Sequence, residues 1–177
     1  MKAERQKTNT PSLDATFLER IPPQNLEAEM SLLGSMLISQ EVIPLVAETV
    51  RADDFYREAH QRIFEAIIGL YTRGEPADPI TAAEELKTNR VLEDVGGKSY
   101  LHTLIGGVPT AANAKYYAGI VERNAVLRSL IRVATEIAGL GYQAPEDVEA
   151  TIDKAESLIF GVSQKRISEK FILIKEL

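Results

Sequence analysis

The feature that most constrains the fold of this chain is a long stretch without proline, from Ala111 to Ala138, in which apolar residues recur at helical spacing. These apolar positions are Tyr116, Ile120, Leu127, Leu130, Ile131, Ala134, Ile137 and Ala138. Thr110 can cap a helix here, and Gly139 and Gly141 are its expected end. At 1.5 Å per residue the helix would be about 42 Å long, which exceeds what a compact domain of this size requires. We therefore expect part of it to project from the rest of the molecule.

A second long helix is expected after Pro145, because apolar residues follow at alternating spacings of four and three. This spacing is typical of a narrow seam of the coiled-coil type. A short turn containing glycine joins the two helices, so the second must fold back as an antiparallel partner. Residues 109–163 are therefore predicted to form a helical hairpin, whose seam on the second arm consists of Val148, Ile152, Ala155, Ile159 and Val162.

Residues 21–108 carry shorter helical patterns separated by glycine and proline, which indicates a small globular subdomain. One helix is expected from Leu26, where Asn25 can cap it. A second is expected over residues 42–50, and a third along the apolar stripe between Tyr56 and Gly74. These three helices supply enough large apolar residues for one core.

Two further short helices complete the expected globule. Thr81 and Glu84 have the spacing of a capping box, which predicts a helix beginning at Thr81. Another is expected around Tyr100, and no segment alternates with the period of two that marks a strand. The chain is therefore predicted to be all-α, a small helical globule followed by a long antiparallel helical hairpin. Residues 1–20, which are polar and lack apolar periodicity, are predicted to be a disordered N-terminal arm.

The amino-acid composition narrows the range of functions that this chain can have. The 177 residues include 20 Lys and Arg against 26 Asp and Glu, so the net charge of −6 opposes general attraction to a phosphate backbone. There is no cysteine, which excludes disulfides and thiolate metal sites and fits a reducing compartment. No apolar run is long enough to span a bilayer or to act as a signal peptide. A soluble, cytoplasmic protein without membrane partners is expected.

Charge separates the two arms of the predicted hairpin. The first carries Lys115, Arg123, Arg128 and Arg132 against Glu122 and Glu136, and the second carries Glu146, Asp147, Glu149, Asp153 and Glu156 against Lys154. In one interpretation the opposite charges steady a single hairpin, at a few tenths of a kcal/mol per exposed pair. In the other, two hairpins from two chains pair through them. The sequence favours neither.

Several motifs that suggest chemistry have simpler explanations. Gly96-Gly97-Lys98-Ser99 looks like the end of a P-loop, but Leu92 stands where that loop needs another glycine, and no strand is expected before it. A turn between two helices, with Gly96 in the left-handed conformation, is predicted instead. His60 and His102 have no second metal ligand at a suitable spacing. Asp53-Asp54 is typical of a turn and helix cap. The sequence therefore predicts no catalytic residue, no metal site and no cofactor site.

The chain resembles the N-terminal domain of bacterial replicative DNA helicases of the DnaB type. The similarity runs in register from about Ile21 to Val162. Its segments are Ile21-Pro22-Pro23-Gln24-Asn25-Leu26-Glu27-Ala28-Glu29 with Leu32-Leu33-Gly34, Asp53-Asp54-Phe55-Tyr56 with His60 and Ile63-Phe64, Asp78 before Thr81 and Leu86, Val95-Gly96-Gly97 with Tyr100-Leu101, Pro109-Thr110-Ala111-Ala112-Asn113 with Tyr117, and Ala155-Glu156 with Ile159-Phe160.

This resemblance implies a non-catalytic module of a larger machine. In the family, six copies form a collar, commonly a trimer of dimers joined partly through the hairpins. The collar stacks on a ring of ATPase domains that draw single-stranded DNA through the channel, and it docks the C-terminal domain of primase; a helicase loader is a further candidate partner. The motor domain, which would bind ATP and Mg²⁺, is absent from this sequence, so the chain is not expected to hydrolyse ATP or unwind DNA. The alternatives are a free-standing helical adaptor and, more remotely, an NTP-dependent enzyme.

Candidate partner-binding residues follow from the hairpin and the resemblance. Arg123, Arg128 and Arg132 are expected at an oligomer interface, and Tyr100, Leu130, Ile131, Ile137 and Ile152 are the candidate apolar anchors for primase. Residues 164–177 resemble the start of the family's linker to the motor domain. Within them, Phe171, Ile172 and Leu173 are expected to be mobile and to dock in a groove of that domain.

Overall fold

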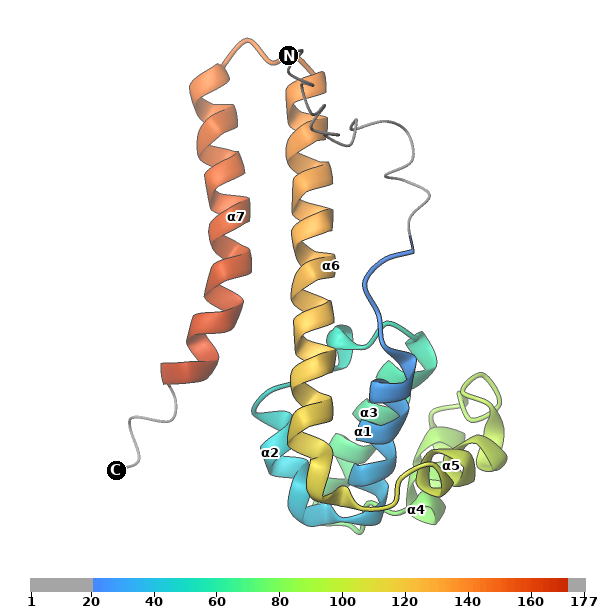
Figure 1. Cartoon of the computed structure of the whole chain (residues 1–177). Coiled ribbons are helices and arrows are strands. Elements are labelled where there is room, and N and C mark those ends of the chain that lie inside the picture. The colour runs from blue at the N-terminus through green and yellow to red at the C-terminus, as the bar shows by residue number, and fades with distance from the viewer. Residues whose placement is uncertain (1–20, 172–177) are drawn as a thin grey trace, which may run out of the picture.

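The computed structural model describes the backbone of residues 21–171 and the side chains of residues 21–164. Within that part of the chain every regular element is a helix, as predicted. Figure 1 shows a globule and a hairpin that rises well beyond it. The globule contains α1 (Leu26–Ile38), the 3₁₀ turn η2 (Gln40–Val42), α2 (Ile43–Ala47), η3 (Ala52–Asp54), α3 (Glu58–Thr72), α4 (Pro79–Thr88) and α5 (Gly97–Gly106); η4 (Ala111–Asn113) leads into the hairpin of α6 (Ala114–Tyr142) and α7 (Val148–Phe171).

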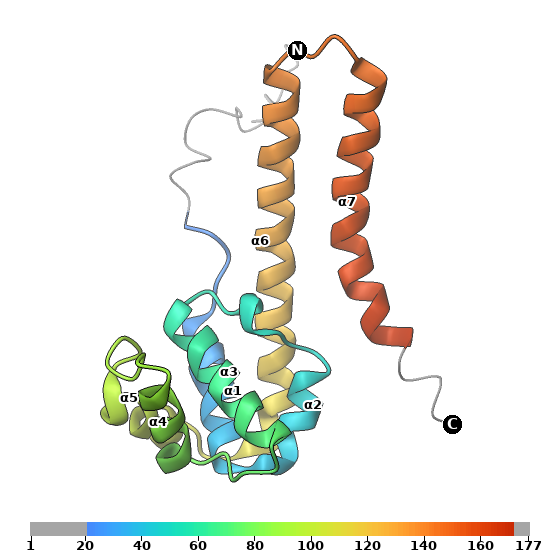
Figure 2. The ribbon, with the colours of Figure 1, turned by 180° about the vertical axis from the view of Figure 1, so that it is seen from behind.

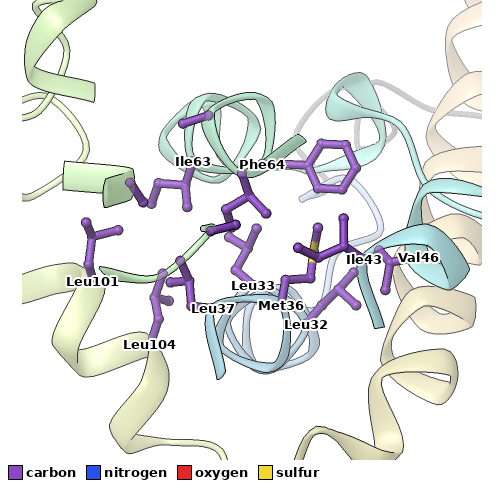
Figure 3. Packing of buried hydrophobic residues seen from close by; sticks show 14 of the residues in the cluster. Leu32, Leu33, Met36, Leu37, Ile43, Val46, Ile63, Phe64, Leu101 and Leu104 are labelled. Carbon is purple, nitrogen blue, oxygen red and sulfur yellow. The ribbon is translucent and has the colours of Figure 1, made fainter. Parts of the chain in front are cut away.

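Helix α1 lies at the centre of the globule. Leu32, Leu33 and Met36 are completely buried on it, and side chains from α3, α5 and α2 close around them (Figure 3). Leu101 and Leu104 of α5 approach closely because Gly34 of α1 has no side chain to hold them off. A Cβ atom at Gly34 would lie only 2.2 Å from the carbonyl oxygen of Leu104.

The helix starts in the globule depend on side-chain caps. Asn25 caps α1 as predicted, its side chain accepting from the backbone N–H of Ala28 at 2.9 Å. The predicted cap at Thr81 is wrong. Asp78 is the N-cap of α4, Pro79 occupies the first turn, and Thr81 is the third helical residue, which completes a capping box with Asp78. Asp-Pro starts this helix more strongly than Thr81 because the carboxylate satisfies two N–H groups and proline needs none.

The hairpin turn also differs from the prediction. Helix α6 does not end at Gly139 and Gly141 but runs through both to Tyr142, over 29 residues. Glycine inside a helix costs only about 1 kcal/mol relative to alanine, so it need not end one. The turn over residues 143–147 depends instead on Pro145, which disfavours helical geometry in the residue before it; Ala144 takes a positive φ of 46°. Asp147 then caps α7 through the N–H of Ala150.

The two arms lie antiparallel, as predicted (Figure 1), and the predicted seam of α7 is right at Ala155 and Val162 but wrong at the other three positions. Val148, Ile152 and Ile159 are exposed. The residues turned toward α6 are Thr151, Ala155, Leu158 and Val162, of which only Val162 is fully buried. Sequence spacing could not separate the two stripes because they lie on adjacent faces of the same helix.

The C-terminal part of α7 is continuous with the hairpin. The helix passes through the expected boundary near Ser163 and extends to Phe171. The side chain of Phe171, and Ile172 and Leu173 altogether, lie outside the described residues, so their docking stays a prediction. In the described part, no single helix is both long and apolar enough to cross a membrane; α1 and the segment after it pass such a test only as a pair bent by 118°.

Candidate protein-interaction surface

The hairpin exposes a row of large apolar side chains, which we call the hairpin face. On α6 the row runs from Leu127 to Tyr142 at intervals of about one turn when exposed Ala134 and Ala138 are included, and Tyr116 lies about three turns before Leu127. Ile131 is 48% exposed and Tyr142 is 91% exposed. Single exposed apolar residues are ordinary, whereas a contiguous row marks an interaction site. The hairpin face consists of Tyr116, Leu127, Leu130, Ile131 and Tyr142 on α6 and Val148, Ile152 and Ile159 on α7.

Helical geometry places both halves of the hairpin face on one side of the hairpin. At about 100° per residue, each apolar row is rotated from its helix's seam in the same sense. In an antiparallel pair, equal senses of rotation bring the two rows to the same side. The buried Ala114, Ala118 and Val121 mark the roughly opposite side of α6, where the globule packs (Figures 1 and 2). The hairpin face therefore points away from the globule.

Charge on the hairpin is distributed along its length. The tip is acidic, with Glu146, Asp147, Glu149, Asp153 and Glu156 all exposed, whereas Lys115 and Arg123 near the root are exposed and basic. Among residues 21–164, the ion pairs found include none between α6 and α7. Within these described side chains, the opposite charges of the two arms are therefore not paired directly.

The three arginines predicted at an oligomer interface have three different environments. Arg123 is exposed on the same side as the hairpin face. Arg132 points elsewhere and lies 3.7 Å from Glu136 of the same helix. Arg128 is turned inward: its guanidinium donates to the backbone carbonyls of Pro23, at 2.8 Å, and of Asp54. Arg128 thus fastens α6 to the globule instead of facing a partner.

The five candidate apolar anchors also separate. Leu130, Ile131 and Ile152 belong to the hairpin face. Ile137 is half-buried and lies on the side of α6 turned toward α7. Tyr100 lies on α5 in the globule, where its hydroxyl is 2.7 Å from Nε2 of His60. The structure therefore brings three of the five together.

The globule contains a buried polar cluster that the sequence did not predict. His60 is fully buried, and its Nδ1 lies 2.6 Å from a carboxylate oxygen of Glu29, which is 2% exposed. Burial of the phenol raises the pKa of Tyr100, and the charge of nearby Arg57 opposes that rise. His60 and Glu29 are on different helices, so no spacing rule could pair them; the only available clue was a carboxylate in the apolar stripe of α1.

The motif at Gly96-Gly97-Lys98-Ser99 forms the start of α5. Gly96 has a positive φ of 103°, the left-handed conformation predicted for it. Lys98 lies 3.6 Å from Glu84 at the surface, and the regular element before this turn is helix α4, not a strand. In the described part of the chain, no cluster of three metal-ligating side chains occurs. Of the candidate sites described above, the hairpin face is therefore the most extensive.

Comparison with known proteins gives consistent matches. A family model described as the DnaB-like helicase N-terminal domain matches residues 21–123. The replicative DNA helicase DnaB of Mycobacterium leprae is 49% identical over 160 residues, which cover 89% of this chain and 26% of that protein. The corresponding protein of Geobacillus stearothermophilus is 45% identical over 161 residues, 91% of this chain and 36% of that protein. The chain thus spans between a quarter and two fifths of the length of these relatives.

Solved structures show the same fold. The N-terminal domain of DnaB helicase from Mycobacterium tuberculosis has 49% identity and a TM-score of 0.77, over 80% of this chain and 99% of that chain. A DnaB-like replicative helicase, whose structure was described together with its interactions with primase, has 21% identity and a TM-score of 0.65. The match covers 86% of this chain and 35% of that one.

Proposed function

Because the chain belongs to the family of DnaB-like helicase N-terminal domains, we propose that it is the collar of a hexameric replicative helicase and that it also docks primase. The observation that carries this proposal is the hairpin face, an apolar surface on a rigid, projecting element that nothing within the described chain covers. ATP and Mg²⁺ would bind a separate motor domain, and single-stranded DNA would pass through the assembled ring. A helicase loader would be a further partner, and the site of action would be the cytoplasm.

The hairpin face suggests how two copies would pair. In an isologous dimer the same surface meets itself across a two-fold axis. If two hairpins lie antiparallel, the acidic tip of one comes beside the basic root of the other. Glu149 and Asp153 would then approach Lys115 and Arg123 of the second copy, while the apolar rows cover each other. Like-charged tips would meet in the parallel arrangement, which is therefore disfavoured.

Dimerisation through the hairpin face can be tested by analytical ultracentrifugation at tens of micromolar. Ile131→Glu and Ile152→Glu each place a charge in the centre of the face and should convert dimers or larger species to monomers. Ser157→Glu is the matched control, since Ser157 is exposed on the other side of α7 and should leave the mass unchanged. Circular dichroism should stay native in all three. Monomers of the unaltered chain at every concentration would refute the collar proposal.

Primase would dock on those apolar residues of the hairpin face that remain exposed after dimerisation. The structural relative described with primase supports a family role in that interaction, and exposed aliphatic or aromatic residues on a rigid helix are typical anchors. Ala substitutions at Leu130, Ile131 and Ile152 should weaken capture of the C-terminal domain of primase, with Ser157→Ala as control. If the oligomer mass falls along with capture, the residues act through assembly. Unchanged capture in every variant would place docking elsewhere or support the adaptor alternative.

A further inference from the structure

A chain of polar contacts begins at the surface of α5. The hydroxyl of Tyr100 lies 2.7 Å from Nε2 of His60 and accepts from Nη1 of Arg57 at 3.2 Å. The ring of Tyr100 stacks parallel to the His60 ring, with 6.0 Å between centroids, and the Arg57 guanidinium lies over the Tyr100 ring, 5.6 Å from its centroid. Tyr100 is half-buried, so this end of the chain of contacts is accessible from solvent.

The middle of the chain of contacts is buried. His60 Nδ1 is 2.6 Å from Oε2 of Glu29, and Oε1 of Glu29 accepts from the backbone N–H of Tyr56 at 2.7 Å. Arg57 can only donate, so the Tyr100 hydroxyl accepts from it and gives its single hydrogen to Nε2. Nδ1–H of His60 then donates to the carboxylate. With the hydrogen of His60 on Nδ1, each of these contacts pairs one donor with one acceptor.

The other end reaches the root of the hairpin. Tyr56, whose N–H is held by Glu29, has its ring 5.7 Å from the guanidinium of Arg128 on α6. Arg128 donates to the carbonyls of Pro23, just before α1, and of Asp54, at the end of η3 and before α3. The contacts therefore run from α5 through α3 and α1 to α6 without a break.

From this continuity we infer that the Tyr100 hydroxyl controls how firmly the root of α6 is held. When the hydroxyl is lost or recruited by another group, Nε2 of His60 is left without its donor inside the protein. A buried Nε2 without a partner is costly, so the His60 ring is held less firmly against Glu29, the group that positions Tyr56. The guanidinium of Arg128 packs on the Tyr56 ring, so a displaced Tyr56 weakens the contacts by which Arg128 holds α6 to the globule. This inference goes beyond the proposed function and does not depend on it.

The test measures the position of the hairpin relative to the globule. The sequence contains no cysteine, so Lys87→Cys on α4 and Thr135→Cys on α6 provide unique sites for spin labels at exposed positions. Labelled protein is diluted in an excess of unlabelled chain, so that only distances within one molecule contribute. Pulsed dipolar spectroscopy should give a narrow distance distribution for the parent. Arg128→Gln and Tyr100→Phe should both broaden it, and Tyr71→Phe, an exposed tyrosine outside these contacts, should not.

A double-mutant cycle supplies the second readout. Tyr100→Phe and Arg128→Gln should each lower the thermal midpoint by roughly 2–4 °C. Together they should lower it by clearly less than the sum, because each breaks the same set of contacts. Tyr71→Phe combined with Arg128→Gln should be additive. If Arg128→Gln does not fold, Arg128→Lys, which keeps the charge but loses the paired donation, takes its place. Additive midpoints, or an unchanged distance distribution in Tyr100→Phe, would overturn the inference.

Discussion

At the residue scale, Glu29 is a charged side chain at a position of α1 where the helical pattern calls for an apolar residue, and the structure accommodates it through hydrogen bonds. It lies on the buried side of α1, among leucines, where an unpaired carboxylate would cost several kcal/mol. His60 and two backbone N–H groups, of Tyr56 and Arg57, offset that cost by donating to its two oxygens. Together with Tyr100, whose hydroxyl contacts His60, the polar cluster joins three segments, namely α1, residues 56–60 and α5.

Replacing Glu29 by Gln should lower the free energy of unfolding by about 1–3 kcal/mol, because an amide nitrogen cannot accept the hydrogen bonds that one carboxylate oxygen accepts. Glu27→Gln, on the exposed side of the same helix, is the control and should change stability by less than about 0.5 kcal/mol. Chemical denaturation with urea gives both values. Equal effects of the two substitutions would mean that the buried cluster is not stabilising.

The cap of α4 predicts a dependence on pH. The backbone N–H groups of Thr81 and Ile80 donate to the Asp78 carboxylate and hold its pKa below the ordinary value. The stabilisation by Asp78 is therefore present above the unfolded pKa, near 3.9, and is lost as pH falls through the lower folded pKa. Asp78→Asn should be less stable than the parent at neutral pH, and the difference should shrink in acid. Urea unfolding of both proteins between pH 7 and pH 2 tests this; a constant difference contradicts it.

At the scale of elements, glycine has a packing role in α1 but none in α6. Gly34 lies at the crossing of α1 and α5, where the absence of a side chain lets Leu104 approach. Gly119, inside α6, has open space around it and serves no packing role that the structure shows. The same residue type therefore permits a close helix contact at one position and only weakens a helix at the other.

The two glycines give a paired prediction. Gly34→Ala should destabilise the protein by at least about 1–3 kcal/mol, because the methyl group meets the backbone carbonyl of Leu104, which cannot give way easily. Gly119→Ala should stabilise it by about 0.5–1 kcal/mol through higher helix propensity. Thermal or urea unfolding monitored by circular dichroism measures both. A stabilised Gly34→Ala protein would show that the crossing of α1 and α5 is looser than described.

At the scale of the whole molecule, the net charge of −6 conceals a strong division along the hairpin. Acidic residues cover its tip, basic residues lie near its root, and no ion pair found in residues 21–164 connects the two arms. Within the described residues, an isolated hairpin forms no direct ion pair between its arms. Two antiparallel hairpins would gain from this division twice, once at each end.

Self-association should therefore weaken with salt. Raising NaCl from 50 to 500 mM shortens the screening length from over 10 Å to about 4 Å, so the dissociation constant of the dimer should rise. Lys115→Gln combined with Arg123→Gln removes the basic root and should flatten this dependence. Sedimentation equilibrium at several salt concentrations gives the constants. Association that strengthens equally with salt in both proteins would indicate purely apolar pairing.

The sequence by itself determined the helical class, the caps at Asn25 and the left-handed Gly96, and the antiparallel hairpin. Helical periodicity, prolines and capping residues act over a few positions, so they can be recognised without knowing the fold. It also identified Leu130, Ile131 and Ile152 as candidate anchors, and the structure places them on one exposed face. Whether they bind a partner stays a prediction.

Only the tertiary structure decided which side of each long helix is covered. Val148 and Ile152 are together more apolar than Thr151 and Leu158, yet it is the second pair that is half-buried, because the position of α6 across the turn decides which side is covered. In the same way, Arg128 resembled any exposed arginine until the carbonyls of Pro23 and Asp54 were brought to it from distant parts of the chain. Glu29 and His60 are 31 residues apart and meet only because α1 and α3 pack together. Contacts of this kind are set by packing between elements, which local spacing does not encode.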